Sequence, residues 1–184
     1  MMHDATGLPG IVVVSGLMAA GKSTVAQALA ERLPRSVHLR GDLFRKIVVN
    51  GRVEMSPEPS VQALAQLELR YELACHAAEA YQAIGFTVIY QDVIIGPYLD
   101  RVMSRLRSSD PGLVFLSPSL DTLAERDRAR RKTAYGESWT PASLGMALRE
   151  TADIGLRLDN SDLTVSETVD AILARASEMR RGLS

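Results

Sequence analysis

The chain has 184 residues, of which 46% are hydrophobic and 23% are charged, so it is long enough to bury a core and has the composition of an ordinary globular protein. Its formal net charge of −1 excludes a global electrostatic attraction to nucleic acid or to a membrane surface. The single cysteine, Cys75, excludes an intrachain disulfide and a cysteine zinc cluster, and its alanine-rich surroundings predict a small buried side chain. The N-terminal segment lacks the pattern of a signal peptide, and no apolar run reaches membrane-spanning length. We therefore expect one cytoplasmic domain over residues 1–184 that binds neither nucleic acid nor membrane.

A glycine-rich motif, GxxxxGKS, follows a β-branched run at residues 11–14, which predicts a buried parallel strand. An amphipathic run at 24–33 follows the motif and predicts a helix that Pro34 ends. Strand, glycine loop and helix form the context in which backbone N–H groups and the positive helix end bind phosphate. Lys22 would reach the terminal phosphates of a nucleotide, and the Ser23 hydroxyl would bind Mg²⁺. The residues expected on the nucleotide are Gly16, Leu17, Met18, Ala19, Ala20, Gly21, Lys22, Ser23 and Thr24.

The remaining segments alternate between strand and helix patterns. Further strands are predicted over 37–40, 86–90, 113–116 and 156–158, and helices over 43–49, 61–83, 98–106, 119–131 and 166–180, with one more from Pro141. This alternation predicts an α/β protein with a parallel sheet of about five strands between two layers of helices. Sites in such sheets lie beyond the carboxyl ends of the strands, where the P-loop, Asp42, Asp92 and Asp159 fall.

Asp42 is the candidate general base. It follows the strand predicted at 37–40, which we expect to lie beside the P-loop strand, so its carboxylate would face the terminal phosphate and accept the proton of an acceptor hydroxyl. The alternative is that Asp42 is the N-cap of the helix predicted at 43–49. Arg45, one turn beyond, either anchors an anionic group or is a surface side chain.

Asp92 is the candidate metal residue. It follows an apolar strand pattern, and in P-loop enzymes an acid in this place commonly holds the hydration shell of Mg²⁺. The alternative is a helix N-cap or a turn residue before Val93.

Cations outnumber acids in the segment 125–132. An alternating-charge helix is usually a solvated face, but three consecutive cations from Arg130 onward precede a Gly- and Trp-containing loop. A helix end followed by cations and a loop predicts a lid over about 126–140, which would bring an arginine onto the transferring phosphoryl group. We expect Arg130 in this role, with Arg128 and Arg131 on the nucleotide.

Four segments taken in order, 15–23, 41–42, 88–96 and 125–136, resemble the chloramphenicol phosphotransferase-like group of small P-loop kinases, within the adenylate and shikimate kinase type of fold. The resemblance implies transfer of the ATP γ-phosphoryl group to a hydroxyl of a small molecule, such as an antibiotic or other secondary metabolite. It also implies that Asp42 is the base, that Lys22 and Ser23 hold ATP and magnesium, and that lid arginines clamp the phosphates. The chain departs from the group in having Gln91 in place of the first of two paired acids, and Thr133 in place of a second lid arginine.

Several alternatives stay open at this point. A nucleotide-dependent switch would need no acceptor, and a nucleoside, nucleotide or polynucleotide kinase would take a different one. The acceptor side is expected over residues 43–83, where Val48, Val49, Val53 and Met55 suggest a partly apolar ligand. An adenine pocket would draw on Arg128 and the segment 159–163. These patterns do not decide whether the protein forms homo-oligomers or whether it prefers ATP to GTP.

Overall fold

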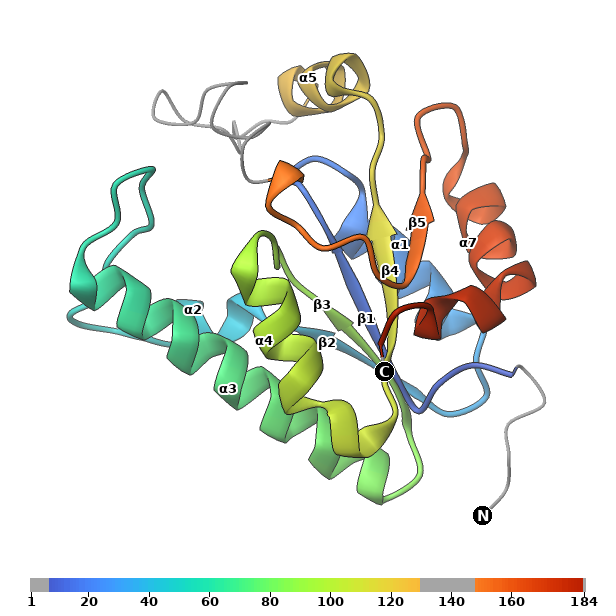
Figure 1. Cartoon of the computed structure of the whole chain (residues 1–184), viewed down its shortest axis with the longest axis horizontal. Helices are drawn as coiled ribbons and strands as arrows, with labels where there is room; N and C mark the ends of the chain where they lie inside the picture. Colours follow the sequence, from blue (N-terminus) through green and yellow to red (C-terminus); the bar gives the residue numbers. More distant parts are fainter. Residues whose placement is uncertain (1–6, 130–147, 184) are drawn as a thin grey trace.

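The computed structural model describes residues 7–129 and 148–183, and its centre is one parallel sheet in the order β2-β3-β1-β4-β5 (Figure 1). The strands are β1 (Ile11–Gly16), β2 (Ser36–Arg40), β3 (Thr87–Gln91), β4 (Gly112–Leu116) and β5 (Leu156–Leu158). The central strand β1 and its neighbour β4 are buried at every residue, as expected for apolar runs that are covered on two faces. The predicted α/β fold with a five-stranded parallel sheet is confirmed.

Helices cover both faces of this sheet. They are α1 (Lys22–Glu31), α2 (Asp42–Lys46), α3 (Val61–Ala83), α4 (Pro97–Arg105), α5 (Leu120–Arg128) and α7 (Val165–Ala174), with 3₁₀ turns η1 (Arg107–Ser109) and η2 (Ala176–Arg180). Alternate residues of β1 divide the core: Val12 and Val14 pack with α1 and α7, whereas Ile11 and Val13 pack with α3 and α4. Figure 1 shows the two helical layers on either side of the strands. In the described part of the chain, no helix combines the length and the apolar character needed to cross a membrane.

The long helix α3 has the bounds that the sequence predicts. Ser60 accepts a hydrogen bond from the Ala63 backbone N–H over 3.1 Å and so caps the first turn, and Gly85, with φ of 85°, follows its last turn. Cys75 lies on its buried face, as predicted. Burial raises the pKa of the Cys75 thiol to about 12.

Two helix predictions are wrong in extent. The helix expected at 43–49 is α2, which starts at Asp42 and already ends at Lys46. The single helix expected at 166–180 is divided into α7 and η2, with Arg175 between them in a non-helical conformation at φ of −111°. The capping box of Thr164 and Glu167, rather than a run of apolar residues, defines where α7 begins.

The prediction of which strand lies beside the P-loop strand is also wrong. The sequence predicts the strand at 37–40 beside the P-loop strand, but β3 lies between β1 and β2, and β2 is one of the two edge strands of the sheet. The order follows from long-range pairing, with Val13 opposite Tyr90 of β3 and Leu39 of β2 opposite that same tyrosine. Asp42, which follows β2, is therefore separated from the P-loop strand by one more strand than the sequence predicts.

Candidate active site

Gly16 ends β1 and opens the P-loop in a conformation that only glycine accepts readily. Its φ is 136°, and a Cβ atom placed on it would lie 2.3 Å from the backbone oxygen of Leu116. The loop therefore turns away from the sheet directly against β4. This close approach explains the first glycine of the motif in structural terms.

The rest of the loop presents backbone groups at the start of α1. Ala19 and Gly21 have positive φ values of 64° and 89°, and no side chain caps the helix at Gly21. The first N–H groups of an α-helix have no acceptor within the helix itself, and at the end of a glycine-rich loop this arrangement suits a phosphate. The buried Asn160 binds the P-loop from the segment after β5: its Nδ2 donates to the Ala20 carbonyl over 3.1 Å.

Lys22 lies folded into the loop that it follows. Its ammonium group donates to the Leu17 carbonyl over 2.6 Å, and the residue is only 6% exposed. The Lys22 ammonium group thus lies inside the loop that it follows. Among the other predicted nucleotide residues, Met18 is half-buried and Thr24 is exposed.

Ser23, the predicted metal residue of the loop, contacts Gln91 rather than Asp92. Its hydroxyl donates to Gln91 Oε1 over 3.2 Å. The reason is the alternation of side chains along a strand: Gln91 points to the face that α1 covers, and Asp92 points to the opposite face. The two predicted metal residues, Ser23 and Asp92, thus lie on different sides of the end of β3.

Asp92 is buried against Arg70 of α3. Asp92 Oδ1 accepts hydrogen bonds from Arg70 Nη2 over 2.9 Å and from the Val93 N–H over 2.7 Å, so the turn-residue alternative describes part of its role. Oδ2 has no hydrogen-bond partner among the described residues and lies against Gly41, where an added Cβ would come within 2.1 Å of it. Burial raises the pKa of Asp92, against the opposing charges of Arg70 and Lys22.

Asp42 is the first residue of α2, and the cap position is Gly41, so the N-cap alternative is wrong. Its carboxylate pairs with Lys46 one turn along the helix and lies 3.7 Å from Arg40 Nε. Partial burial favours the neutral acid, but the hydrogen bond and charge of Lys46, with Arg40 and Arg70, outweigh it and lower the pKa of Asp42. The carboxylate is therefore ionised at neutral pH, as an acceptor of a proton must be.

The segment that carries Asp42 and the P-loop both contact the end of β3. The Gly41 N–H donates to the Gln91 carbonyl over 3.0 Å, and the Gln91 side chain accepts the hydrogen bond of the Ser23 hydroxyl. Asp42 therefore follows a residue that lies beside this end of β3, although β3 separates β2 from β1.

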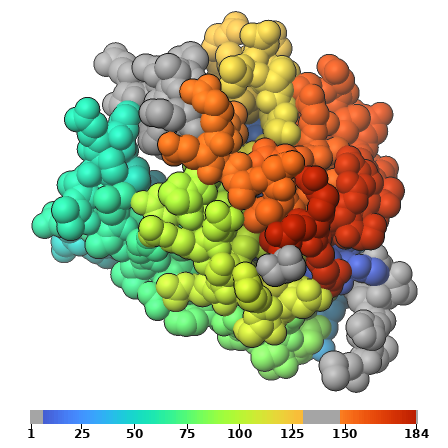
Figure 2. Space-filling model, in the orientation of Figure 1, coloured from blue at the N-terminus to red at the C-terminus, as the bar shows by residue number. Residues whose placement is uncertain are grey.

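The segment predicted to border an acceptor carries more charged side chains at its surface than the four apolar residues named from the sequence suggest. Val49 is 89% exposed and Met55 packs against the core, whereas Arg45 Nη1 donates to Glu54 Oε1 over 2.6 Å and Arg52 joins the same glutamate. The segment between α2 and α3 projects at the left of the molecule (Figures 1 and 2). These ion pairs lie on the surface of α2 and of the segment between α2 and α3.

The two parts of the predicted adenine pocket lie together. Arg126 of α5 donates to the carbonyl of Asn160 over 2.8 Å, which fixes the helix against the segment after β5. Arg128 is exposed at the end of α5 and donates to the Ala124 carbonyl over 3.2 Å. Arg130 and Arg131, and most of the lid predicted at about 126–140, lie outside the described residues.

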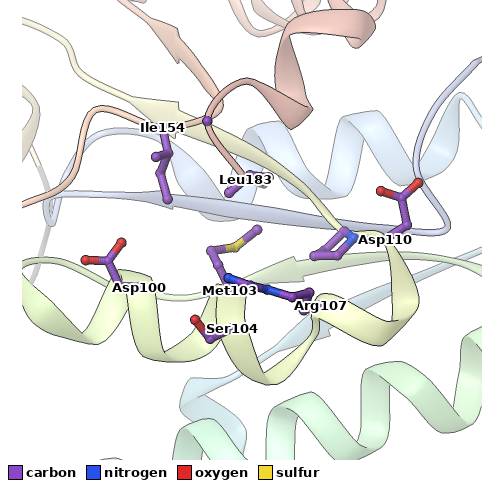
Figure 3. A pocket seen from close by; sticks show the side chains of 9 residues that line it. Asp100, Met103, Ser104, Arg107, Asp110, Ile154 and Leu183 are labelled. Carbon is purple, nitrogen blue, oxygen red and sulfur yellow. The ribbon is translucent and has the colours of Figure 1, made fainter.

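A separate depression lies at the opposite edge of the sheet. It is formed by α4, the start of β4 and the C-terminal segment, where Met103, Ile154 and Leu183 face one another (Figure 3). Because Pro111 precedes β4, this depression is at the amino ends of the strands, away from the P-loop. It is not part of the candidate active site.

Sequence reasoning missed Arg70 and the contact of Gln91 with Ser23, and it named Asn160 only within the segment 159–163, without its contact to Ala20. Counting alternate positions along β3 would have placed Gln91 on the α1 face. No local signal marks Arg70 or Asn160, because their partners are 22 and 140 residues away in sequence. Among residues 7–129 and 148–183, no cluster of three or more His, Cys, Asp or Glu side chains forms a protein cage for a metal ion.

Comparisons with known proteins identify the family and the fold of the chain. The chain matches, over residues 11–153, the family AAA_33, described as an AAA domain. No curated protein sequence matches the chain significantly.

Solved structures share its fold. The tunicamycin resistance protein of Deinococcus radiodurans is 18% identical with a TM-score of 0.65, covering 95% of this chain and 98% of its own. A gluconokinase from Sinorhizobium meliloti is 19% identical with a TM-score of 0.60 and 94% coverage of both chains. The APS kinase of Mycobacterium tuberculosis, in complex with AMPPNP and APS, is 18% identical with a TM-score of 0.64, covering 91% and 97%. With its GxxxxGKS loop between β1 and α1 and a profile match over most of its length, the chain belongs to the AAA_33 family and has a P-loop nucleotide-binding fold of the kind found in kinases.

Proposed function

We propose that this chain is a small-molecule kinase that transfers the γ-phosphoryl group of ATP to a hydroxyl group. The observation that carries the proposal is the place of Asp42, an ionised carboxylate whose neighbour Gly41 is hydrogen bonded to Gln91, the residue that contacts Ser23 of the P-loop. A nucleotide switch has no need of such an acid. The resemblance to the chloramphenicol phosphotransferase-like group, and the kinases among the solved structures of this fold, support the same reaction.

In the proposed reaction, an oxygen of the acceptor hydroxyl bonds to the γ-phosphorus as the bond from that phosphorus to the bridging oxygen of ADP breaks. The hydroxyl proton passes to the Asp42 carboxylate, and ADP leaves with the electron pair of the broken bond. Lys22 leaves the Leu17 carbonyl and stabilises the charge that develops on the phosphates. Arg130, with Arg128 and Arg131, would complete this clamp from the lid.

The residues present fit a magnesium ion that arrives with a nucleotide. Ser23 offers a hydroxyl oxygen whose proton is directed at Gln91, so its lone pairs remain available for a cation. Mg²⁺ keeps several waters and needs few protein ligands when phosphates supply the others, which agrees with the lack of a protein cage in the described residues. When bound, the ion neutralises phosphate charge. The buried Asp92 would act on this site through its charge.

The acceptor is proposed to be a small polar molecule bound between α2, the projecting segment and α3. Arg45, Glu54 and Arg52 supply paired charges there, and Arg70 lies deeper beside Asp92. Antibiotics and other hydroxylated secondary metabolites belong to this chemical class. Nucleic acid is a poor candidate because the chain has a net charge of −1 and few aromatic residues.

Mass spectrometry tests the proposal directly. The protein is incubated with Mg²⁺, ATP and a panel of hydroxylated antibiotics, nucleosides and sugars, and each acceptor is examined for the mass gain of one phosphoryl group. We expect a gain on a small-molecule acceptor that Asp42→Asn and Lys22→Ala each reduce by at least about 100-fold.

The matched control is Asp121→Asn, which removes an exposed acid from the first turn of α5 and should leave the gain unchanged. ADP formation that needs no acceptor and persists in Asp42→Asn would favour the nucleotide switch instead. Phosphorylation of an oligonucleotide end in place of a small molecule would reject the proposed acceptor class.

A further inference from the structure

The outer face of α3 lacks the charged side chains that a surface helix normally presents to solvent. The helix has 23 residues, and the Asp, Glu, Lys and Arg residues among them are all partly buried. The exposed residues of α3 are Val61, Gln62, Ala65, Leu69, Leu73, His76, Ala80, Tyr81 and Ala83. This distribution is the reverse of the usual one, because the solvent side of the helix is mostly apolar.

Residues at intervals of three or four form one row along this face, which we call the outer row: Val61, Ala65, Leu69, Leu73, His76, Ala80 and Ile84. Such intervals keep side chains on one side of a helix. Val61, Leu69 and Ile84 are 83%, 52% and 61% exposed, and in Figure 1 α3 lies along the margin of the molecule. A continuous apolar row on the surface of a globular protein marks an interaction surface.

The acids beside the outer row have partners within the chain. Glu68 pairs with Arg101 of α4, and Glu72 Oε1 lies 3.3 Å from Arg105 Nη1 of the same helix. Two copies of one surface bring identical charges together, so an unpaired excess of either sign would make them repel. Pairing with α4 removes that repulsion. A strongly charged partner, by contrast, would find no opposite charge on the row.

We propose that the outer row is a contact between two copies of this chain, with the two α3 helices antiparallel about a two-fold axis near Leu73. In a two-fold contact each residue meets its counterpart reciprocally. Val61 then faces Ile84 of the second copy, and Ala65 faces Ala80. Large side chains thus meet at the two ends of the contact, and the small alanines between them let the helices approach closely.

The length of α3 limits the strength of this contact. A helix of 23 residues is about 34 Å long, and a contact stripe ~10 Å wide covers ~350 Å² on each copy, or ~700 Å² in total. Contacts below ~1,200 Å² belong to weak complexes, so we expect a reversible dimer with a Kd on the order of 10–100 µM. The contact requires neither nucleotide nor acceptor, so it is independent of the proposed kinase reaction.

Sedimentation velocity of the full chain, from about 1 µM to about 300 µM, tests the proposal. We expect the mass of one chain at the low end and a majority of dimer at the high end. Leu69→Glu and Leu73→Glu should each raise the Kd at least about 30-fold, because every substitution enters the contact twice and adds like charges. If Leu73→Glu does not fold, Leu73→Gln carries the test with a smaller rise.

Val165→Glu is the matched control. Val165 is 39% exposed and Leu73 is 37% exposed, but α7 packs on the opposite face of the sheet from α3, so the Kd should not change. A chain that stays monomeric at about 300 µM overturns the proposal and leaves the row to a different occupant. Dimers that Leu69→Glu and Leu73→Glu leave intact also overturn it, because a different surface then forms them.

Disulfide formation between substituted cysteines tests the antiparallel register. Under mild oxidation, Leu73→Cys should link two copies, because position 73 lies near the axis. Ala65→Cys alone should not link, whereas a mixture of Ala65→Cys and Ala80→Cys chains should. Rapid linkage of Ala65→Cys to itself would overturn the antiparallel arrangement. The native Cys75 is buried and does not interfere.

Discussion

Replacing Arg70 by methionine should leave a buried carboxylate without its charged partner. Arg70 Nη2 lies 2.9 Å from Asp92 Oδ1, and the two side chains are 12% and 3% exposed. Methionine keeps most of the apolar stem of the arginine, so the change removes chiefly the charge and its hydrogen bonds. Breaking a buried pair on one side typically costs about 3–5 kcal/mol.

Protonation of Asp92 limits how much stability the Arg70→Met variant can lose. At about pH 7, neutralising an aspartate with a normal pKa near 3.9 costs about 4 kcal/mol, and at about pH 5 it costs only about 1.5 kcal/mol. Burial already raises the pKa of Asp92, so the folded chain binds its proton more tightly than the unfolded chain does, and stability from this group falls as pH rises between the two pKa values. Removing Arg70 raises the pKa of Asp92 in the folded chain further, so stability falls over a wider range of pH.

The assay is urea denaturation at about pH 7 and about pH 5, with the free energy of unfolding as the readout. We expect Arg70→Met to lose about 3–4 kcal/mol at the higher pH and about 1.5 kcal/mol at the lower one. Adding Asp92→Asn should restore part of the loss, because it removes the stranded charge.

Arg101→Met is the matched control. Arg101 lies 5.4 Å from the ring of Tyr98, much as Arg70 lies 5.3 Å from the ring of Tyr71, but its partner Glu68 is exposed. The control should change stability by no more than about 1 kcal/mol. If Arg70→Met matched Arg101→Met at both pH values, the reasoning about the buried pair would be refuted.

Three further outcomes are expected. Gly16→Ala should destabilise the fold by at least about 2 kcal/mol and abolish ATP binding, because the new Cβ meets the Leu116 oxygen at 2.3 Å; an unchanged melting temperature would contradict this. Asn160→Ala should weaken ATP binding and cost about 1–2 kcal/mol in urea denaturation by releasing Ala20, with the exposed Asn50→Ala as control. Cys75, whose pKa burial raises to about 12, should react with Ellman's reagent only after unfolding; rapid labelling of the folded chain would show that the thiol is accessible.

Local patterns in the sequence determined the elements and much of the phosphate loop. The bounds of α3 follow from the Ser60 cap and from Gly85, both of which act within one turn of the helix. The P-loop could be identified because its strand, glycines and helix are contiguous in the chain. These features depend on φ, ψ and hydrogen bonds between near neighbours, which sequence periodicity records.

The candidate site could be predicted only in part. Asp42 was named as the base from its place after a strand, and its ionised state agrees with that role without testing it. Asp92 was named as the metal residue, whereas the contact to Ser23 belongs to Gln91, one position earlier. A shift of one residue along a strand exchanges the two faces of the sheet, so an error of one position moves a side chain to the other side of the site.

What only the tertiary structure decided is which distant elements meet. β3 lies between β1 and β2, and Arg70 pairs with Asp92. Both contacts join segments that are far apart in the chain, and no local sequence pattern predicts them. Strand order depends on which apolar faces bury the most surface together, and a buried ion pair depends on the shape that results. The sequence therefore determined that a phosphate loop is present, and the packing of α1, α3 and the sheet decided which side chains surround it.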